Sequence, residues 1–572
     1  METNAAVVNG DEVPYLRNNS KKNAQIEDIL QNNNGVKDGS QEKLSFENNS
    51  NTDLSSDRSK SEDEILGRSM SMDKIRNRLQ QMEKDLTEQV SHQVKEMISE
   101  VMEQLEKVQP EKLINDLFDE SSKTNNKKKS SKPGSLPEKE FLSRNSPLTD
   151  LFKIKHIRAI YHIFIVIFII LFINTAVYDI VDTGSTNLGV NTIMIGFGKL
   201  NKVFCIWLGM MLTSLGVYLA FSFWANQRVQ ISPGSMKLKI WDYGWLISLI
   251  AYQISFIVFP VKALLEEDLP PASSLIILME QVRLMMKIHA FVRSAAPRTL
   301  NFKPHTEKNG ETTCPEFSKF LYFLFCPTLI YRDSYPRTNV IRWRFVLWHY
   351  TEVIIVVFAV VFLFERLLIP VFKQFGTNPL EPGTLVLSIC GTMMPAILAF
   401  LSAFYCLLHS WMNASAELLR FADRMFYKDW WNATSYSVYF RTWNIVIHDW
   451  LYSYIYKDMY ELVTRGNKII STLTVFTVSA IFHEYILAFA FRFFYPALFV
   501  SFAGVSLSFV FLSRKIEKAG GNVFIWLTLC LGVGVNLSLY SMEFYARINC
   551  PAHPDKYLDL IIPRSWTCHN LT

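Results

Sequence analysis

The sequence has little charge and little cysteine for its length. Of its 572 residues, 19% are charged, 49% are apolar and 14% are aromatic. Because a soluble surface needs about a quarter of the residues charged, this composition excludes a soluble multidomain enzyme. The eight cysteines form no CxxC pair and no Cys/His cluster at zinc spacing, which excludes a secreted disulfide scaffold and predicts no metal site. The net charge of +5 gives no indication of nucleic-acid binding.

The charge that is present is concentrated at the N-terminal end. Residues 1–150 contain 22 Lys or Arg and 28 Asp or Glu, so one third of them are charged. Residues 151–572 contain 36 and 25, so only one seventh are charged. The first segment is suited to water, and the second is too apolar for a water-facing surface. The sequence therefore predicts a water-exposed head followed by an all-α integral membrane domain over 141–572.

The head divides into three parts. Residues 1–74 are rich in Asn, Ser, Asp and Lys, which predicts a disordered tail. There is no apolar run near Met1, so we expect no cleavable signal peptide. Residues 75–120 contain an apolar stripe close to heptad spacing, which ends before Pro110. This helix either lies on the domain or membrane or mediates self-association, and the spacing does not separate the two. Residues 121–140 form a polar, basic linker. The stripe comprises Ile75, Leu79, Met82, Leu86, Val90, Val94, Met97, Val101, Leu105 and Val108.

Nine apolar segments are long enough to cross a bilayer as helices, which needs about 20 residues. The fourth segment is the weakest because Glu280, Arg283 and Lys287 interrupt it, although Glu280 and Arg283 are spaced to pair on one helical face. The nine segments are 160–181, 203–224, 244–265, 271–292, 345–370, 386–411, 469–490, 493–513 and 522–545.

Basic residues predict the orientation of these spans. If the N-terminus is cytosolic, the cytosolic segments hold 24 Lys or Arg and the opposite side about eight. This bias requires the fourth span and places the C-terminus across the membrane. Cys550 and Cys568 both lie in that far-side tail, where a disulfide between them is chemically allowed.

Two segments carry more polar groups than membrane residence explains. The predicted cytosolic stretch 413–467 contains Phe426–Asn432 and Arg441–Trp450, in which aromatic rings alternate with polar side chains. An interfacial aromatic belt explains the rings but not the clustered polar groups. On a helix, Asn444 and His448 would share one face, as in a ligand pocket.

The second segment surrounds His483 in the seventh apolar segment. His483 lies 15 residues after Lys468, or roughly 22 Å along a helix. An ionisable group at that depth is either hydrogen-bonded to a neighbouring helix or functional. A desolvated imidazole is favoured in its neutral form, which is the form that a general base needs. Glu484 points to another helical face and is a structural partner in this interpretation.

These motifs resemble the membrane-bound O-acyltransferase family, and in particular its sterol O-acyltransferase branch. The resemblance rests on Phe426–Asn432, Asn444 and His483, and it extends from about residue 140 to the end through Leu269–Ser273, Tyr322–Asp333 and Pro563–Cys568. It implies a nine-span helical bundle in the endoplasmic reticulum membrane, assembled as a homodimer or homotetramer. The implied reaction transfers a long-chain fatty acyl group from acyl-CoA, a co-substrate and not a cofactor, to the hydroxyl of cholesterol.

The resemblance also implies residue roles. His483 matches the catalytic histidine and Asn444 its supporting asparagine. The residues matched to acyl-CoA or substrate binding are Phe426, Tyr427, Lys428, Asp429, Trp430, Trp431, Asn432, Arg441, Trp443, His448, Tyr456, Lys468 and Ser479. Val438 and Phe440 depart from the family pattern, which more often has Asn and Tyr there.

Two rival functions remain open at this point. A diacylglycerol O-acyltransferase carries a similar aromatic signature, but the continuation His448–Tyr452 and the long head favour the sterol branch. A membrane transporter or sterol sensor would also have several spans with charges inside the membrane.

Overall fold

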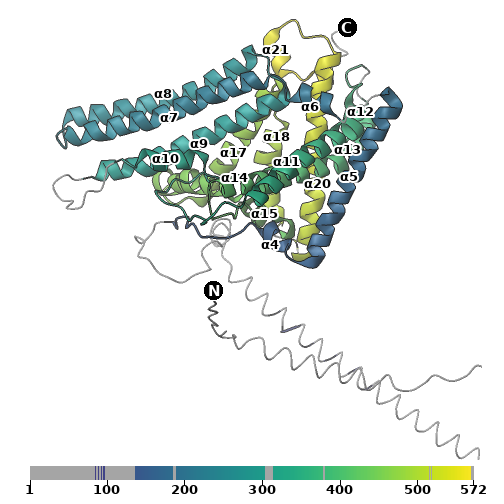
Figure 1. The fold of residues 1–572 in the computed structure, drawn as a ribbon, viewed down its shortest axis with the longest axis horizontal. Helices are drawn as coiled ribbons and strands as arrows, with labels where there is room; N and C mark the ends of the chain where they lie inside the picture. The colour runs from purple at the N-terminus through teal and green to yellow at the C-terminus, as the bar shows by residue number, and fades with distance from the viewer. Residues whose placement is uncertain are drawn as a thin grey trace, which may run out of the picture. The chain divides into compact units, whose positions relative to one another are not determined.

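The computed structural model describes residues 136–567 except 185–188, 303–313, 378–380, 514, 515 and 517 (Figure 1). It also describes seven positions of the head, which are Gln81, Lys84, Glu88, His92, Lys95, Glu96 and Ser99. The chain divides into two compact units, Met1–Leu105 and Glu106–Thr572. In the first unit, the seven described residues are helical and exposed. The apolar stripe of 75–108 and Cys568 lie outside the described residues.

The second unit is helical throughout its named elements. The long helices are α5 (Lys155–Thr183), α7 (Leu200–Gln230), α8 (Met236–Glu266), α9 (Pro271–Asn301), α11 (Trp343–Leu363), α13 (Pro382–Phe404), α17 (Lys468–Phe491) and α20 (Lys518–Asn549). The shorter α-helices are α4 (Pro147–Leu151), α6 (Val190–Gly196), α10 (Phe317–Phe325), α12 (Ile369–Phe372), α14 (Met412–Leu418), α15 (Tyr436–Trp443), α16 (Ile445–Leu451), α18 (Ala497–Val500), α19 (Leu507–Leu512), α21 (Lys556–Ile561) and α22 (Arg564–Thr567). Short π-helical turns are η3 (Phe364–Leu368), η4 (Tyr405–Trp411), η6 (Tyr452–Tyr456), η7 (Met459–Val463) and η8 (Ser501–Ser506), and η5 (Trp430–Asn432) is a 3₁₀ turn.

Seven of the nine predicted spans correspond to helices that are long and apolar enough to cross a membrane. Their bounds are Lys155–Asp182, Val190–Gln230, Met236–Glu266, Trp343–Phe372, Pro382–Leu418, Lys468–Phe491 and Gly520–Asn549. The other two predicted spans do not meet both criteria, each for its own reason. The predicted span 493–513 corresponds to a shorter apolar helix, Ala497–Leu512. The predicted span 271–292 lies in α9, which is 31 residues long but carries charged residues along its length. The all-helical membrane architecture is confirmed, whereas the count of nine spans stays a prediction.

The charges of α9 are explained by its packing inside the bundle. Figure 1 shows α9 alongside the α7 and α8 pair, and α9 also packs against α17. Glu280 and Arg283 form the ion pair that their spacing predicted, at 2.6 Å, and the Trp207 indole donates to Glu280 at 3.1 Å. Lys287, only 1% exposed, donates to the carbonyl oxygens of Phe323 and Cys326. Each charge therefore has a protein partner, which lowers the cost of burying it.

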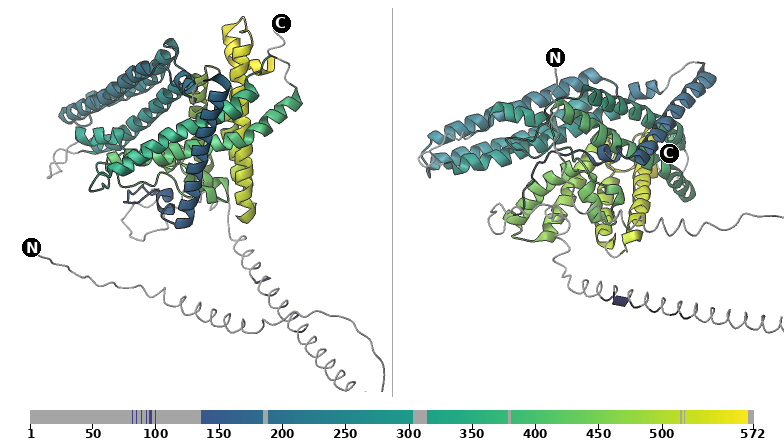
Figure 2. Two further views of the ribbon diagram at one scale, coloured as in Figure 1. Left: turned by 45° about the vertical axis from the view of Figure 1, so that its right-hand side comes forward. Right: turned by 60° about the horizontal axis from the view of Figure 1, so that its bottom comes forward.

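Helix α13 packs along α20 with an unusually close approach. At Gly534 in α20, a β-carbon would lie 2.6 Å from the Met393 Cγ and 3.1 Å from the Met393 Cα of α13. A larger residue would push the helices apart, as at the small-residue contacts of membrane helix pairs. Both views in Figure 2 show the α20 helix, in yellow, as one of the longest elements of the bundle.

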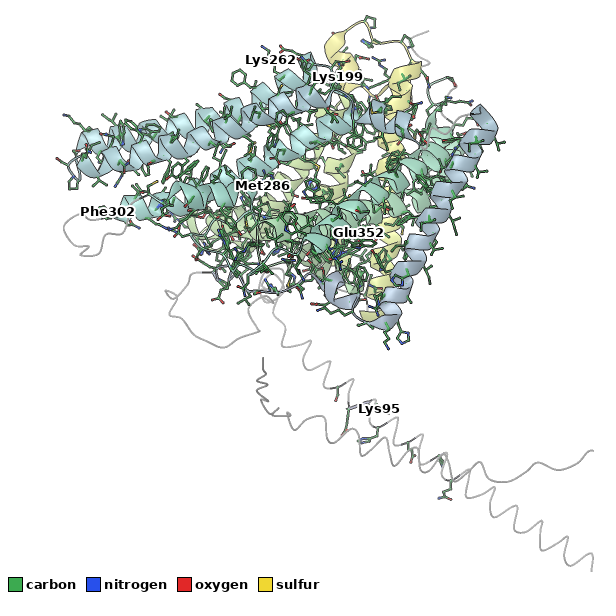
Figure 3. All side chains as sticks on the ribbon, in the orientation of Figure 1. Lys95, Lys199, Lys262, Met286, Phe302 and Glu352 are labelled. Carbon is green, nitrogen blue, oxygen red and sulfur yellow. The ribbon has the colours of Figure 1, made fainter. Side chains whose placement is uncertain are left out.

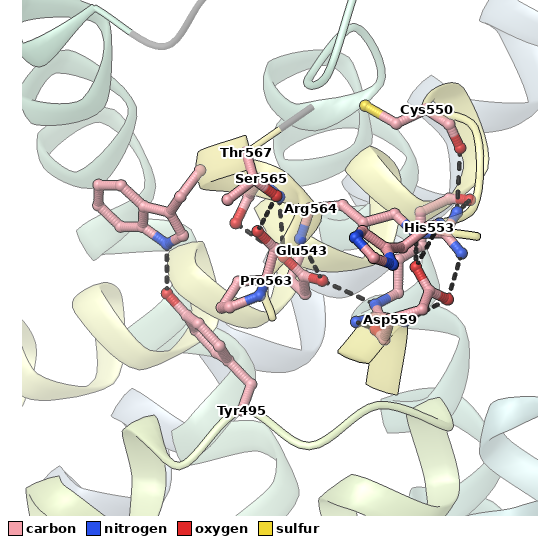
Figure 4. A network of polar contacts seen from close by, with 11 residues as sticks. Tyr495, Glu543, Cys550, His553, Asp559, Pro563, Arg564, Ser565 and Thr567 are labelled. Atoms are coloured by element: carbon pink, nitrogen blue, oxygen red, sulfur yellow. Dashed lines mark hydrogen bonds and ion pairs between the residues drawn. The ribbon is translucent and has the colours of Figure 1, made fainter. Parts of the chain in front are cut away.

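A polar cluster closes the C-terminal end of α20 (Figure 4). Glu543, which is fully buried, forms an ion pair with Arg547 at 2.7 Å and accepts hydrogen bonds from the backbone nitrogens of Arg564 and Ser565, both at 3.0 Å. Arg564 forms a second ion pair with Asp559 at 2.6 Å. These contacts fold the tail onto the end of α20. Cys550 lies in this region and is buried, whereas Cys568 is not described, so the disulfide stays a prediction. The other six cysteines are free thiols.

Candidate active site

His483 lies in the middle of α17. Its Nδ1 atom is 2.7 Å from the backbone carbonyl oxygen of Ser479, one turn earlier in the same helix. Its ring stacks on Phe502 of η8, with centroids 4.5 Å apart and an angle of 20° between the ring planes. The side chain is exposed and not sealed between helices. Among the described residues, none from a neighbouring helix forms a hydrogen bond with His483, so that alternative has no support.

The contact with Ser479 determines which nitrogen of His483 carries the proton. A carbonyl oxygen only accepts hydrogen bonds, so Nδ1 must donate and a neutral ring has its lone pair on Nε2. No described residue forms a hydrogen bond with Nε2. The ring therefore presents an unprotonated and accessible nitrogen, and Phe502 restricts its orientation from one side.

Glu484, the next residue, is directed elsewhere. It is 4% exposed, and its carboxylate oxygens lie 2.8 and 2.9 Å from the Tyr540 hydroxyl of α20. The same carboxylate accepts a hydrogen bond from the backbone nitrogen of Phe499 at 3.1 Å. Phe499 is three residues before Phe502. Glu484 thus joins α17 to α18 and α20 and helps to hold the ring that packs on His483.

Asn444 interrupts the helical stretch that follows the aromatic signature. Its extended backbone ends α15, and its Oδ1 atom caps α16 by accepting from the Ile447 nitrogen at 3.2 Å. Asn444 therefore precedes the helix of His448 and is not inside it. Because Oδ1 is occupied by the cap, the amide Nδ2 remains, and none of the described residues bonds to it. The half-buried side chain of Asn444 thus offers hydrogen-bond donors.

Aromatic rings connect this region to His483. Phe440 of α15, one turn before Asn444, lies 6.1 Å from Phe502 and 5.3 Å from Phe476 of α17, measured between ring centroids. Phe502 in turn stacks on His483. Phe440 is one of the two departures from the family pattern, and here it contributes packing between the signature region and α17.

The signature Phe426–Asn432 consists of buried rings and accessible polar groups. Phe426, Tyr427 and Trp430 are at most 3% exposed, whereas Asp429 and Asn432 are exposed. Two backbone hydrogen bonds tie the signature to the chain around Asn444, from Lys428 N to Thr442 O at 2.8 Å and from Ile445 N to Phe426 O at 2.9 Å. The three buried rings therefore act here as a packing core that supports Asn444, and the polar positions face outwards.

The remaining predicted residues come from several elements. Trp443 stacks on Phe400 at 4.6 Å, and Tyr456 belongs to a ladder of stacked rings with Tyr452 and Tyr460. Arg441, His448 and Trp431 are half-buried, and Lys468 begins α17 at the end that leads to His483.

A buried network that the sequence did not predict contacts the signature. Glu352 of α11 accepts hydrogen bonds from Tyr161, Tyr405 and Ser410 and pairs with His349 at 2.7 Å; Figure 3 labels its position in the bundle. His409 packs its ring against His349 and forms a 2.7 Å hydrogen bond with the Tyr427 hydroxyl. An acidic residue inside an apolar segment was the available signal, since such a group needs partners.

A cluster of cations lies beside Lys428. The pKa of the Lys428 ammonium group is lowered by burial and by the positive charges of Arg144, Arg441 and Lys139. Lys139 pairs with Asp449 at 2.6 Å, and His448 Nδ1 lies 3.5 Å from the same carboxylate. Burial raises the pKa of Asp449, but His448 and Lys139 more than offset this and hold it below its usual value. Among the described residues, no group of three or more His, Cys, Asp or Glu could hold a metal ion.

Comparison with known proteins gives a consistent family. The model of the membrane-bound O-acyltransferase family matches residues 239–542. The chain is 42% identical to sterol O-acyltransferase 1 of Mus musculus over 433 residues, which are 75% of this chain and 79% of that protein. It is 41% identical to sterol O-acyltransferase 2 of Homo sapiens over 436 residues, which are 76% of this chain and 81% of that protein. His483, Asn444 and the signature all lie within the matched region.

Proposed function

Because the chain belongs to the membrane-bound O-acyltransferase family, a family of acyltransferase enzymes, we propose that it esterifies a sterol. The acyl donor in this proposal is a long-chain fatty acyl-CoA, the acceptor is cholesterol, and the products are a cholesteryl ester and CoA. The observation that carries the proposal is His483, whose Nδ1 atom is occupied by the Ser479 carbonyl and whose Nε2 atom is accessible.

The proposed chemistry is a direct transfer. A sterol hydroxyl is a weak nucleophile, and Nε2 of His483 takes its proton as the oxygen attacks the thioester carbonyl. The new C–O bond forms, the C–S bond breaks, and CoA leaves as a thiol after it receives the proton. General-base help of this kind contributes about 10²- to 10⁴-fold in rate. No covalent acyl-enzyme is required because the thiol is a good leaving group.

Asn444 has the second role in this mechanism. With its Oδ1 atom held by the helix cap, its free amide group donates to the thioester carbonyl or to the developing oxyanion. One such donor contributes about 3–4 kcal/mol to the stabilisation of a transition state. The buried signature rings support Asn444, and the outward polar residues Lys428, Asp429 and Asn432 contact the donor.

The setting of the reaction is part of the proposal. The domain spans the endoplasmic reticulum membrane nine times. Two of these spans are α9, which is less apolar, and the Ala497–Leu512 helix, which is shorter. The N-terminus is cytosolic, the C-terminus is lumenal, and Cys550 pairs there with Cys568. Charged acyl-CoA arrives from the cytosol, whereas cholesterol and its ester move through the bilayer. The chain assembles as a homodimer or homotetramer through the head helix of 75–120.

Substitution of His483 tests this function. In His483→Asn, the amide nitrogen can still donate to the Ser479 carbonyl, so the helix keeps its local bond but loses the base. We expect transfer of labelled oleate from oleoyl-CoA to cholesterol to fall at least about 100-fold, with an unchanged elution profile in detergent. Retained turnover in this variant would reject His483 as the base.

A further inference from the structure

Gln281 of α9 is a fully buried polar side chain that has no part in the proposed chemistry. Its Nε2 atom donates to the backbone carbonyl oxygens of Phe256 and Ile257 in α8, at 2.7 and 3.0 Å. Its Oε1 atom accepts a hydrogen bond from the Tyr485 hydroxyl of α17 at 2.7 Å. Gln281 therefore joins α8, α9 and α17 through one amide group.

A proline inside α8 explains why an amide is needed at this place. Pro260 has no backbone N–H, so the carbonyl oxygen of Phe256, four residues earlier, lacks its helical donor. In membrane helices, a side chain of a neighbouring helix can supply such a missing donor, and Gln281 does so here. Because a carbonyl oxygen only accepts, the amide nitrogen of Gln281 must face α8, which leaves the amide oxygen for Tyr485.

Tyr485 anchors α17 close to the candidate base. Side chains on an α-helix turn by about 100° per residue, so His483, Glu484 and Tyr485 leave α17 in three different directions. Glu484 is held by Tyr540 of α20. Tyr485 is held by Gln281 of α9, and His483 is exposed. Two anchors therefore restrain the rotation of α17 about its axis at the level of His483.

A small rotation of α17 would be costly for catalysis. An α-helix with its side chains has a radius of about 5–6 Å, so a turn of about 10° moves an outer atom by about 1 Å. A misplacement of about 1 Å can reduce a rate by about 100-fold. Loss of one of the two anchors should have a smaller effect, because the other one remains.

We propose that Gln281 and Tyr485 are positioning residues that keep the Nε2 atom of His483 directed towards the acceptor hydroxyl. This inference rests on the proposed function. Neither residue touches the reactants. Tyr485 fixes the direction of α17, and Gln281 fixes Tyr485 from the carbonyl oxygens of α8. Pro260 contributes from a third helix by leaving the carbonyl oxygen that orients Gln281.

A substitution of Pro260 distinguishes this role from a contribution to stability alone. Gln281→Met keeps a side chain of similar size but removes all three hydrogen bonds. Adding Pro260→Ala supplies the N–H that the Phe256 carbonyl lacks, so α8 regains its backbone bond whereas Tyr485 stays without its partner. A purely structural role of Gln281 should therefore be rescued by Pro260→Ala, and a positioning role should not.

The test measures thermal melting and steady-state kinetics of the purified full-length protein with labelled oleoyl-CoA and cholesterol. We expect Gln281→Met and Tyr485→Phe each to lower kcat about tenfold with the KM for oleoyl-CoA unchanged, because the base moves and the donor site does not. Gln281→Met with Pro260→Ala should melt closer to wild type and keep the low kcat. The matched control is Tyr218→Phe, because the Tyr218 hydroxyl donates to the Pro315 carbonyl at 2.9 Å and not to α17.

A combined variant checks that the two residues act through one contact. Gln281→Met with Tyr485→Phe should lose no more kcat than the more affected single variant, since both changes remove the same hydrogen bond. Fully multiplicative losses would show independent roles and reject the proposed chain of contacts. Tyr485→Phe removes a single hydroxyl, so it provides the test if Gln281→Met does not fold.

Other results would also overturn the inference. An unchanged kcat in Tyr485→Phe would show that the anchor on α9 does not position the base. Recovery of kcat together with the melting temperature on adding Pro260→Ala would assign Gln281 to stability alone, as would an equal loss of kcat in Tyr218→Phe. If the wild-type protein esterifies no sterol, the proposed function fails. That result is distinct from an active wild type whose variants keep its kcat, which rejects only the positioning role.

Discussion

Tyr540 of α20 provides a test of how the surrounding structure positions His483. Its hydroxyl lies 2.8 and 2.9 Å from the Glu484 carboxylate oxygens and 2.8 Å from the Tyr495 carbonyl oxygen. Tyr540→Phe leaves the buried Glu484 carboxylate to backbone groups alone, among them the Phe499 nitrogen at 3.1 Å. Loss of a hydrogen bond to a charged group costs about 1.5–3 kcal/mol of the free energy of unfolding. In a protein of this size we expect a melting temperature lower by about 1–3 °C.

The same substitution should reduce catalysis. Glu484 holds Phe499 and so the turn that carries Phe502, whose ring packs on His483. Freeing this turn should lower kcat about tenfold, since small displacements of a catalytic group are costly, while the KM for oleoyl-CoA stays unchanged. The control is Tyr545→Phe, because the Tyr545 hydroxyl has no hydrogen bond with any described residue. If Tyr540→Phe melts and turns over like wild type, or if Tyr545→Phe loses as much, the positioning role of Glu484 is wrong.

Two further predictions concern the ends of the chain. The pKa of Asp559 is lowered from 3.8 to about 2, mainly by its hydrogen bond with Arg564. The ion pair therefore stabilises the tail above about pH 4, and this contribution is lost as the pH falls from about 4 to 2. Thermal melting should therefore show wild type more stable than Asp559→Asn at pH 7, with the difference shrinking at pH 3; a difference independent of pH would contradict this. At the other end, deletion of residues 1–120 should reduce the oligomer size measured by light scattering if 75–108 is a self-association helix, and an unchanged size would reject that role.

Hydropathy was sufficient to predict most of the membrane helices, because a long apolar segment has few alternatives to a spanning helix. It was less informative for α9, where Glu280, Arg283 and Lys287 are stabilised by Trp207 and by two backbone carbonyls, contacts that depend on tertiary packing. The pair Glu280–Arg283 was predictable because it is local, at three residues apart.

The sequence singled out candidate residues for the site but not the contacts that hold them. The depth of His483 marked it as a candidate, but its bond to Ser479 and its stacking on Phe502 required coordinates. Donor binding by Phe426–Asn432 stays a prediction, and the structure adds that Phe426, Tyr427 and Trp430 are buried. The placement of residues 136–146 could not be anticipated, because a polar segment without periodicity gives no signal for contacts such as Lys139 with Asp449, 310 residues away.

The central claim, that a sterol is the acceptor, is tested most directly by one competition assay. Purified protein receives labelled oleoyl-CoA with cholesterol and diacylglycerol together, and the lipid products are separated and counted. We expect labelled cholesteryl ester as the main product, and none from His483→Asn. Label found only in triacylglycerol would reject the sterol as acceptor and assign the chain to glyceride synthesis.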